Sequence, residues 1–86
     1  MTNQVEWTTK ATRQLLQIDR RYIAAIREKV AKLTEFPQVH LDIKHLENNQ
    51  YRLRHGDYRV FFEVIDGTPK IINIQKIQRR NNRTYK

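Results

Sequence analysis

Residues 51–67 read YRLRHGDYRVFFEVIDG and decide how this chain folds. The run 51–55 alternates in period two, the run 58–65 is rich in β-branched and aromatic residues, and the two flank the pair Gly56-Asp57. A glycine beside an aspartate between two such runs is typical of the tight turn in a β-hairpin. The stretch therefore predicts two antiparallel strands joined by a short turn.

Side-chain alternation assigns the two faces of this hairpin. Four large apolar side chains of the second strand share one face, which we expect to lie beneath helices: Tyr58, Val60, Phe62 and Val64. If Leu53 of the first strand joins them in the core, Arg52 and Arg54 point outward beside Arg59. Alternation thus predicts three guanidinium groups on the face away from the helices.

The sequence before the hairpin predicts a short strand over residues 3–7 and then two helices. Thr8-Thr9 offers a hydroxyl cap for a helix that runs to about Asp19. A second helix, capped by Asp19, runs from Arg20 to about Glu35 and ends before Pro37. Its apolar residues recur at helical spacing: Ile23, Ile26, Val30 and Leu33.

The remaining segments complete the predicted topology. We read 38–49 as a connection that ends in a turn at Asn48-Asn49, 70–77 as a last strand and 78–86 as a basic tail. The order β-α-α-β-β-β predicts one α+β domain over residues 1–86, with a small antiparallel sheet, an N-terminal strand and a two-helix hairpin packed on one face.

Charge is unevenly distributed along the chain, whose net charge is +8. Residues 1–49 contribute +2 and residues 50–86 contribute +6, which indicates a nucleic acid or another acidic partner. A generally basic protein without such a partner is the alternative. Because the chain has no cysteine and no long apolar run, we expect a cytoplasmic protein without membrane contact.

The arginines suit a phosphate-bearing ligand, because a guanidinium binds phosphate through two hydrogen bonds and stays charged. Clustered cations can stabilise a pentacoordinate phosphorus without a metal, and an RNA 2′-hydroxyl can serve as the nucleophile. His55 is the one nearby group suited to proton transfer near neutrality, although a half-buried structural imidazole is equally compatible. The alternative for Arg52 and Arg54 is protection of a strand edge against aggregation.

Metal and cofactor sites are not predicted. His40 and His45 lack a third ligand at a familiar spacing, and the only glycines, Gly56 and Gly67, do not form a phosphate-binding loop.

The hairpin, the strand around 70-KIINIQKI-77 and the ending 79-RRNNRTYK-86 together resemble the RelE/ParE superfamily of bacterial type II toxins, and the RelE-like mRNA interferases most. The resemblance spans nearly the whole chain. It implies a ribosome-dependent endoribonuclease that cuts mRNA in the A site of the 70S ribosome. It further implies a cognate antitoxin, with operator DNA contacted only through that antitoxin.

The resemblance also implies roles for individual residues. Arg52 and Arg54 would hold and activate the scissile phosphate, and Arg59 would stabilise the transition state. Arg80 would protonate the leaving oxygen, or Arg79 if the register slips by one, and Tyr85 would stack on an mRNA base. Further RNA contacts are expected from the remaining cations of this part of the chain: Lys76, Arg79 and Arg83.

Two departures from the RelE pattern affect these roles. The pattern has lysines where this chain has Arg52 and Arg54, and a guanidinium is a poor general base. His55, His45 and Asp57 therefore remain open as proton acceptors. The usual glycine after the K-x-L segment at 44–46 is also absent.

Two other functions remain open for the same fold. One is a ParE-like poison of DNA gyrase that leaves RNA intact. The other is a weakly active toxin fold that acts mainly as a corepressor in an antitoxin complex.

Overall fold

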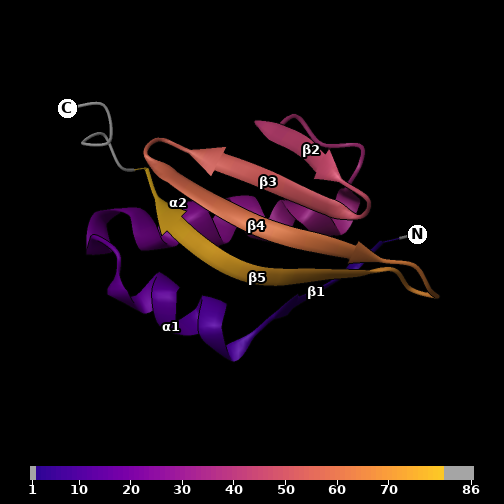
Figure 1. Cartoon of the computed structure of the whole chain (residues 1–86), viewed down its shortest axis with the longest axis horizontal. Coiled ribbons are helices and arrows are strands. Elements are labelled where there is room, and N and C mark those ends of the chain that lie inside the picture. Colours follow the sequence, from indigo (N-terminus) through magenta and orange to yellow (C-terminus); the bar gives the residue numbers. More distant parts are fainter. Residues whose placement is uncertain (1, 81–86) are drawn as a thin grey trace.

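The computed structural model describes residues 2–80 and contains two α-helices and a five-stranded sheet. The elements follow the order β1 (Gln4–Trp7), α1 (Thr9–Gln17), α2 (Arg20–Ala31), the 3₁₀ helix η1 (Lys32–Glu35), β2 (Ile43–Glu47), β3 (Gln50–His55), β4 (Tyr58–Ile65) and β5 (Ile71–Arg79). The α+β class with helices on one face of the sheet is confirmed (Figure 1).

The strands lie side by side in the order β1-β5-β4-β3-β2. The four strands from β2 to β5 form antiparallel pairs, whereas β1 pairs with β5 in parallel. The predicted antiparallel sheet is therefore present in β2–β5, and the predicted N-terminal strand joins it through a parallel pairing that the sequence did not indicate. A helical crossover between β1 and the rest of the sheet permits this parallel pairing, because a tight turn would have forced an antiparallel one.

The prediction that residues 38–49 form only a connection was also wrong, because Ile43–Glu47 is the edge strand β2. Ile43 pairs with Leu53 and Lys44 with Arg52, and a bulge follows His45. Most of β2 is exposed, so few apolar residues marked it as a strand. The turn predicted after it is present, with Asn48 at a φ of +48°.

Two further boundaries differ from the prediction. The α-helical part of the second helix ends at Ala31, and the chain continues as the 3₁₀ helix η1. At the end of η1, Phe36 N donates to Leu33 O over 3.0 Å. Tightening of the last turn satisfies terminal carbonyls that would otherwise lack a donor. The last strand runs to Arg79 rather than residue 77, because Gln78 and Arg79 pair with Arg59 and Tyr58 of β4.

Both helices begin as the sequence predicts. The Thr8 hydroxyl accepts a hydrogen bond from Ala11 N over 3.0 Å, and Asp19 Oδ1 accepts one from Arg21 N over 3.0 Å. These side chains occupy the N-cap positions of α1 and α2 and satisfy amides that have no partner within the helix.

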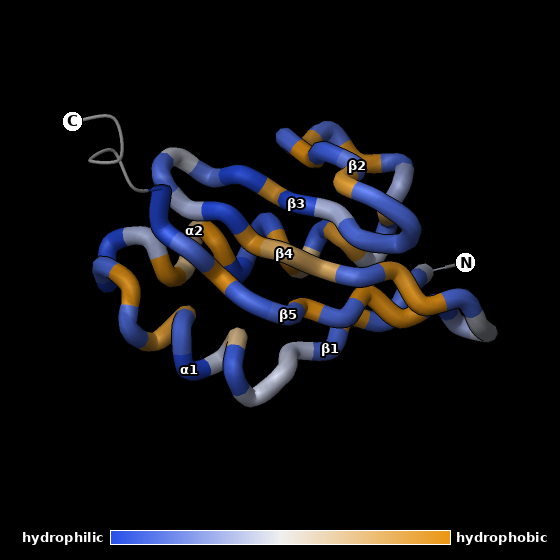
Figure 2. The backbone as a smooth tube through the Cα atoms, viewed as in Figure 1, coloured by the Kyte–Doolittle hydropathy of each residue, from blue (hydrophilic) through white to orange (hydrophobic). Residues whose placement is uncertain are grey.

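The core lies between the helices and the sheet. Its largest fully buried side chains come from both layers: Ile26, Val30, Leu33, Leu53, Val60, Phe62, Ile72 and Ile74. The predicted alternation is confirmed, since Tyr58, Val60, Phe62 and Val64 are all buried. Figure 2 shows the middle of β4 as a continuous hydrophobic stretch, because Phe61 adds an apolar side chain to the opposite face.

A candidate nucleic-acid interface on the open face of the sheet

Two rows of side chains cross the open face of the sheet, which is the face without helices. The strand register aligns Lys44, Arg52, Phe61 and Lys76 in the first row, one from each of β2, β3, β4 and β5. It aligns Arg54, Arg59 and Gln78 in the second. Neighbours within a row have Cβ atoms about 5 Å apart, and the rows lie about 7 Å apart along the strands. We call these residues the basic face.

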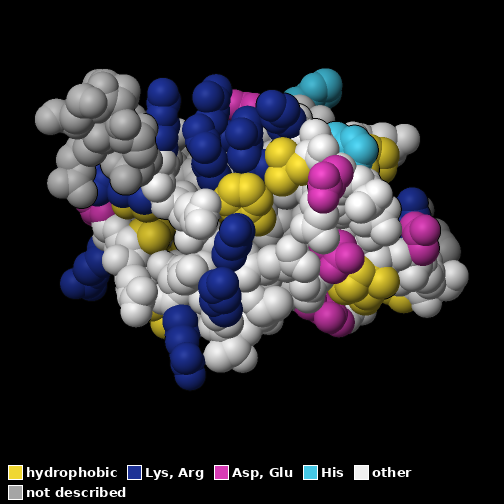
Figure 3. All heavy atoms as spheres, viewed as in Figure 1, with side chains coloured by type: hydrophobic (Ala, Val, Ile, Leu, Met, Phe, Trp, Pro, Cys, Tyr) yellow, Lys and Arg dark blue, Asp and Glu magenta, His cyan; other side chains and the backbone are white. Residues whose placement is uncertain are grey.

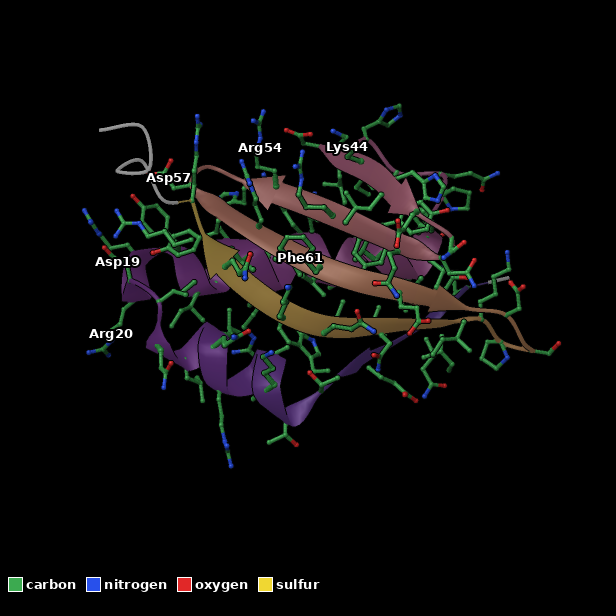
Figure 4. The ribbon with its side chains drawn as sticks, viewed as in Figure 1. Asp19, Arg20, Lys44, Arg54, Asp57 and Phe61 are labelled. Carbon is green, nitrogen blue, oxygen red and sulfur yellow. The ribbon has the colours of Figure 1, made fainter. Side chains whose placement is uncertain are left out.

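The basic face is visible as one area of the surface. Figure 3 shows Lys and Arg side chains gathered over β3 and β4, next to a hydrophobic patch near the middle of the sheet. Figure 4 places Lys44 and Arg54 near the β2 edge and Phe61 over the middle of β4. Acidic side chains gather toward the other end of the molecule (Figure 3). The sheet therefore presents cations around an aromatic ring.

A bulge in β5 brings Lys76 onto this face. Phe61 pairs with Lys76 and Phe62 pairs with Ile74, so Gln75 is an extra residue without a partner in β4. The extra residue shifts the alternation by one, and both Ile74 and Ile77 are buried as a result. Lys76 and Gln78 then fall on the open side.

Arg52 and Arg59 lie partly buried against the sheet. The Nε atoms of both are buried and have no hydrogen-bond partner among residues 2–80. A buried N–H group without an acceptor costs free energy. A bound anion that accepts hydrogen bonds from the guanidinium would remove this cost. These two side chains are the best placed of the basic face to bind a phosphate.

Arg54 differs from them because it is paired with a carboxylate. Its Nε donates to Asp42 Oδ2 over 2.8 Å, and its backbone N donates to Asp42 O over 2.9 Å. About half of each side chain remains exposed, so this ion pair is strongly solvated. Asp42 fixes the direction of the Arg54 guanidinium and offsets part of its charge.

Phe61 forms the floor of a groove over β4. The groove has a volume of about 490 Å³ and is lined on its two sides by residues of β2 and β5, among them Lys44 and Lys76. The Lys76 Nζ atom lies 4.9 Å from the centre of the Phe61 ring, a cation–π arrangement. A flat ring beside cations is suited to stack on a nucleic-acid base.

His55 lies on the helix side of the sheet, away from the basic face. Its ring is 6.3 Å from that of Tyr22 on α2, and it lines a cavity of about 240 Å³ at the end of the sheet. Burial lowers the pKa of His55, and the charge of Lys29 lowers it further. The structure therefore does not bring His55 together with the three arginines.

Arg79 also faces the helix side, because it pairs with the core residue Tyr58. It lines the same cavity as Asp19. The pKa of Asp19 is lowered to about 2, chiefly by hydrogen bonds from Arg21 and in small part by the charge of Arg79. Arg80 follows the strand, and its backbone N donates to Asp57 O over 2.6 Å. Arg83 and Tyr85 lie outside the described residues.

Lys44 and Asp42 belong to the site but were missed by sequence reasoning, because their segment was read as a connection. A weak signal was present, since Leu41 and Ile43 alternate with Asp42 and Lys44 as in a strand. Within residues 2–80 no group of three His, Asp or Glu side chains is arranged to hold a metal ion. No helix in that range is long and apolar enough to span a lipid bilayer.

Comparison with known proteins identifies the class of the chain. Residues 5–83 match the family model described as the ParE toxin of the type II toxin–antitoxin system ParDE. The chain therefore belongs to the RelE/ParE superfamily of type II toxins. No curated protein matches it significantly.

Solved structures of RelE proteins share the fold. The RelBE2 toxin–antitoxin complex of Mycobacterium tuberculosis matches with 26% identity and a TM-score of 0.75, over 93% of this chain and 100% of that one. The archaeal RelE–RelB complex of Pyrococcus horikoshii matches with 26% identity and a TM-score of 0.78, over 95% and 99%. The isolated RelE toxin of E. coli, at 12% identity over 96% and 89%, shares the fold with a TM-score of 0.77.

Proposed function

We propose that this toxin is an endoribonuclease that cuts mRNA in the ribosomal A site and so inhibits translation. The observation that supports this most is the arrangement of cations around Phe61 on a sheet face that helices leave open. A strand of RNA presents phosphates and unstacked bases, and the basic face offers a partner for each. The ribosome would supply the mRNA in an extended form.

In the proposed reaction, Arg52 and Arg59 hold the scissile phosphate. The 2′-hydroxyl of the preceding ribose attacks the phosphorus, and both guanidinium groups stabilise the charge that grows on its oxygens. Arg54 contributes a further positive charge from its fixed position beside Asp42. We assign protonation of the leaving 5′-oxygen to Arg80 and stacking on a base to Tyr85, following the RelE resemblance.

The same fold could instead serve a poison of DNA gyrase, and one observation favours that candidate. The matching family model carries the description of a ParE toxin rather than a RelE toxin. The solved relatives at 26% identity, in contrast, are RelE proteins. The basic face would suit DNA phosphates as well, so the two candidates need a direct assay.

The proposed physiological partner is a cognate antitoxin, because both solved relatives at 26% identity are complexes of a toxin with RelB. An acidic or amphipathic segment of the antitoxin would cover the basic face or pack on the helices. Operator DNA would be contacted through the antitoxin. If the chain proved inactive, a role as corepressor in this complex would remain.

The deciding experiment maps mRNA ends by primer extension on purified 70S ribosomes, with and without the protein. New ends inside A-site codons, absent when ribosomes are omitted, are the expected result. Arg59→Ala should abolish them, whereas Arg20→Ala, at the start of α2 and away from the basic face (Figure 4), should not. Intact mRNA at concentrations that stop growth would reject the proposal, and gyrase-dependent DNA cleavage would then establish the alternative.

A further inference from the structure

The proposed cleavage needs a group that the arginines do not provide. When the 2′-hydroxyl attacks phosphorus, its proton must pass to a base. A guanidinium is already protonated at neutral pH and cannot accept a further proton, whereas the free amine of a lysine side chain can accept one. The base must therefore be another group that can reach a phosphate on Arg52.

Lys44 occupies that position. It pairs directly with Arg52 across the β2–β3 ladder, in the same row as Phe61. It lines the groove whose floor is Phe61, and it is exposed. Lys44 makes no ion pair with any residue from 2 to 80. Because the Lys44 amine lies next to the Arg52 guanidinium and has no ion-pair partner within residues 2–80, it is free to contact the ribose of a bound RNA.

The other titratable groups near the groove are engaged elsewhere or lie farther away. Lys76 Nζ rests on the Phe61 ring, and Glu63 Oε1 accepts a hydrogen bond from Gln75 Nε2 over 3.1 Å. His45 Nε2 is 2.6 Å from Asn48 O, and its ring packs 4.8 Å from that of Tyr51. Glu47 pairs with Gln50, one row away from Arg52.

We propose that the amine of Lys44 is the general base of the cleavage reaction. It takes the proton of the 2′-hydroxyl while the bond from the 2′-oxygen to phosphorus forms. The bond from phosphorus to the 5′-oxygen breaks, and its electron pair leaves with that oxygen, which takes a proton from Arg80. The products are a 2′,3′-cyclic phosphate and a 5′-hydroxyl. This assignment rests on the proposed endoribonuclease function.

The first test keeps the charge and removes the base. Lys44→Arg should lower single-turnover cleavage on programmed ribosomes by about 100-fold or more, the usual contribution of a general base. Binding to a short RNA should stay within twofold, because the positive charge remains. The matched control is Lys70→Arg, an exposed lysine that precedes β5 and lies outside the basic face.

A second test restores an amine chemically. Because the chain has no cysteine, Lys44→Cys creates a single thiol that 2-bromoethylamine converts into an aminoethyl group, a lysine analogue with a more acidic ammonium. We expect the aminoethyl protein to regain cleavage and its pH–rate profile to shift toward lower pH. Alkylation with iodoacetamide, which adds a neutral amide, should not restore activity.

The outcomes separate this inference from the proposed function. If the unaltered protein cuts mRNA and Lys44→Arg cuts equally well, Lys44 is not the base although the function stands. Rescue by iodoacetamide, or an unshifted pH profile after aminoethylation, would likewise overturn it. If the unaltered protein cuts no mRNA on ribosomes, the proposed function itself fails.

Discussion

Asp42 offsets part of the charge of Arg54 within the basic face, through a hydrogen bond of 2.8 Å from Arg54 Nε to Asp42 Oδ2. Arg54 also lies directly opposite Arg59 in the β3–β4 ladder. Two like charges on opposing residues destabilise a sheet, and a carboxylate beside one of them reduces the repulsion. The Asp42–Arg54 ion pair thus has two effects. It reduces the repulsion between Arg54 and Arg59 in the β3–β4 hairpin, and it lowers the positive charge of the basic face that would contact RNA.

Asp42→Asn should increase RNA binding. The change frees the Arg54 guanidinium for a phosphate, so we expect tighter binding and a salt dependence steeper by about one unit in the slope of log affinity against log salt. Fluorescence anisotropy of a labelled RNA at several salt concentrations measures both. Since the ion pair is half exposed, the free energy of unfolding should change by less than about 1 kcal/mol. Equal effects from Asp66→Asn, in the β4–β5 loop, would contradict a specific role for Asp42.

Arg59→Ala should abolish toxicity without unfolding the protein. Loss of a guanidinium that stabilises the transition state should reduce cleavage by about 100-fold or more. Lysine at the same position keeps the charge but not the two-pronged hydrogen bonding, so Arg59→Lys should recover only part of the activity. Growth inhibition and single-turnover cleavage check this, with thermal unfolding as the test of an intact fold. Full toxicity of a folded Arg59→Ala variant would reject the assigned role.

Phe61→Ala should weaken RNA binding by about 1–3 kcal/mol, the usual worth of a base stacked on an aromatic ring. Phe61→Tyr should preserve binding because it retains the ring. Titration of a short RNA by anisotropy compares these variants with Ile65→Ala, which removes an exposed apolar side chain at the far end of the same strand face. If the two alanine variants bound RNA equally well, Phe61 would not be a stacking platform.

The partly buried imidazole of His55 should make stability depend on pH. Well above pH 6.5, the ordinary pKa of histidine, His55 is neutral in both the folded and the unfolded chain and adds no pH dependence. Below it the unfolded chain takes up the proton first, because burial lowers the pKa of His55 in the folded state. The free energy of unfolding should therefore fall as the pH decreases from 6.5. Urea unfolding at pH 7.5 and 5.5 should show this decrease, and His55→Gln should reduce it.

Asp19 should contribute in a separate and more acidic range. Its pKa is about 2 in the folded state against an ordinary value of 3.8, so the stability it confers is present above pH 4 and is lost as the pH falls through 2. Asp19→Asn should leave the decrease between pH 6.5 and 5.5 unchanged and flatten the stability profile below pH 4. An altered profile near pH 6 would show that the two groups are coupled across their common cavity.

Most of the fold followed from local sequence signals. The hairpin around Gly56, both N-caps and the buried side of β4 each depend on residues close in the chain. Two features depend on distant partners and could not be read locally. The strand β2 pairs only with β3, and β1 pairs in parallel with β5, from which two α-helices and three strands separate it in the chain.

The sequence likewise predicted only the part of the candidate site that depends on regular strand alternation. Regular alternation placed Arg52, Arg54 and Arg59 on one face. The position of Lys76 depended on the bulge at Gln75, for which the sequence carries no turn or glycine signal. Lys44 lies on an edge strand that the sequence signals only weakly. The residues that the sequence did not place on this face are those whose positions depend on a bulge or on an edge strand.

The order of strands in the sheet has a consequence for the synthesis of this toxin. The strand β5 lies between β1 and β4, yet it is the last of the five strands to leave the ribosome, and Gln4 cannot pair until Ile71 has been made. Contacts between such distant residues form slowly and late. We expect nascent chains that end before β5 to remain protease-sensitive on the ribosome, so that the cell completes the whole domain before any of it can act.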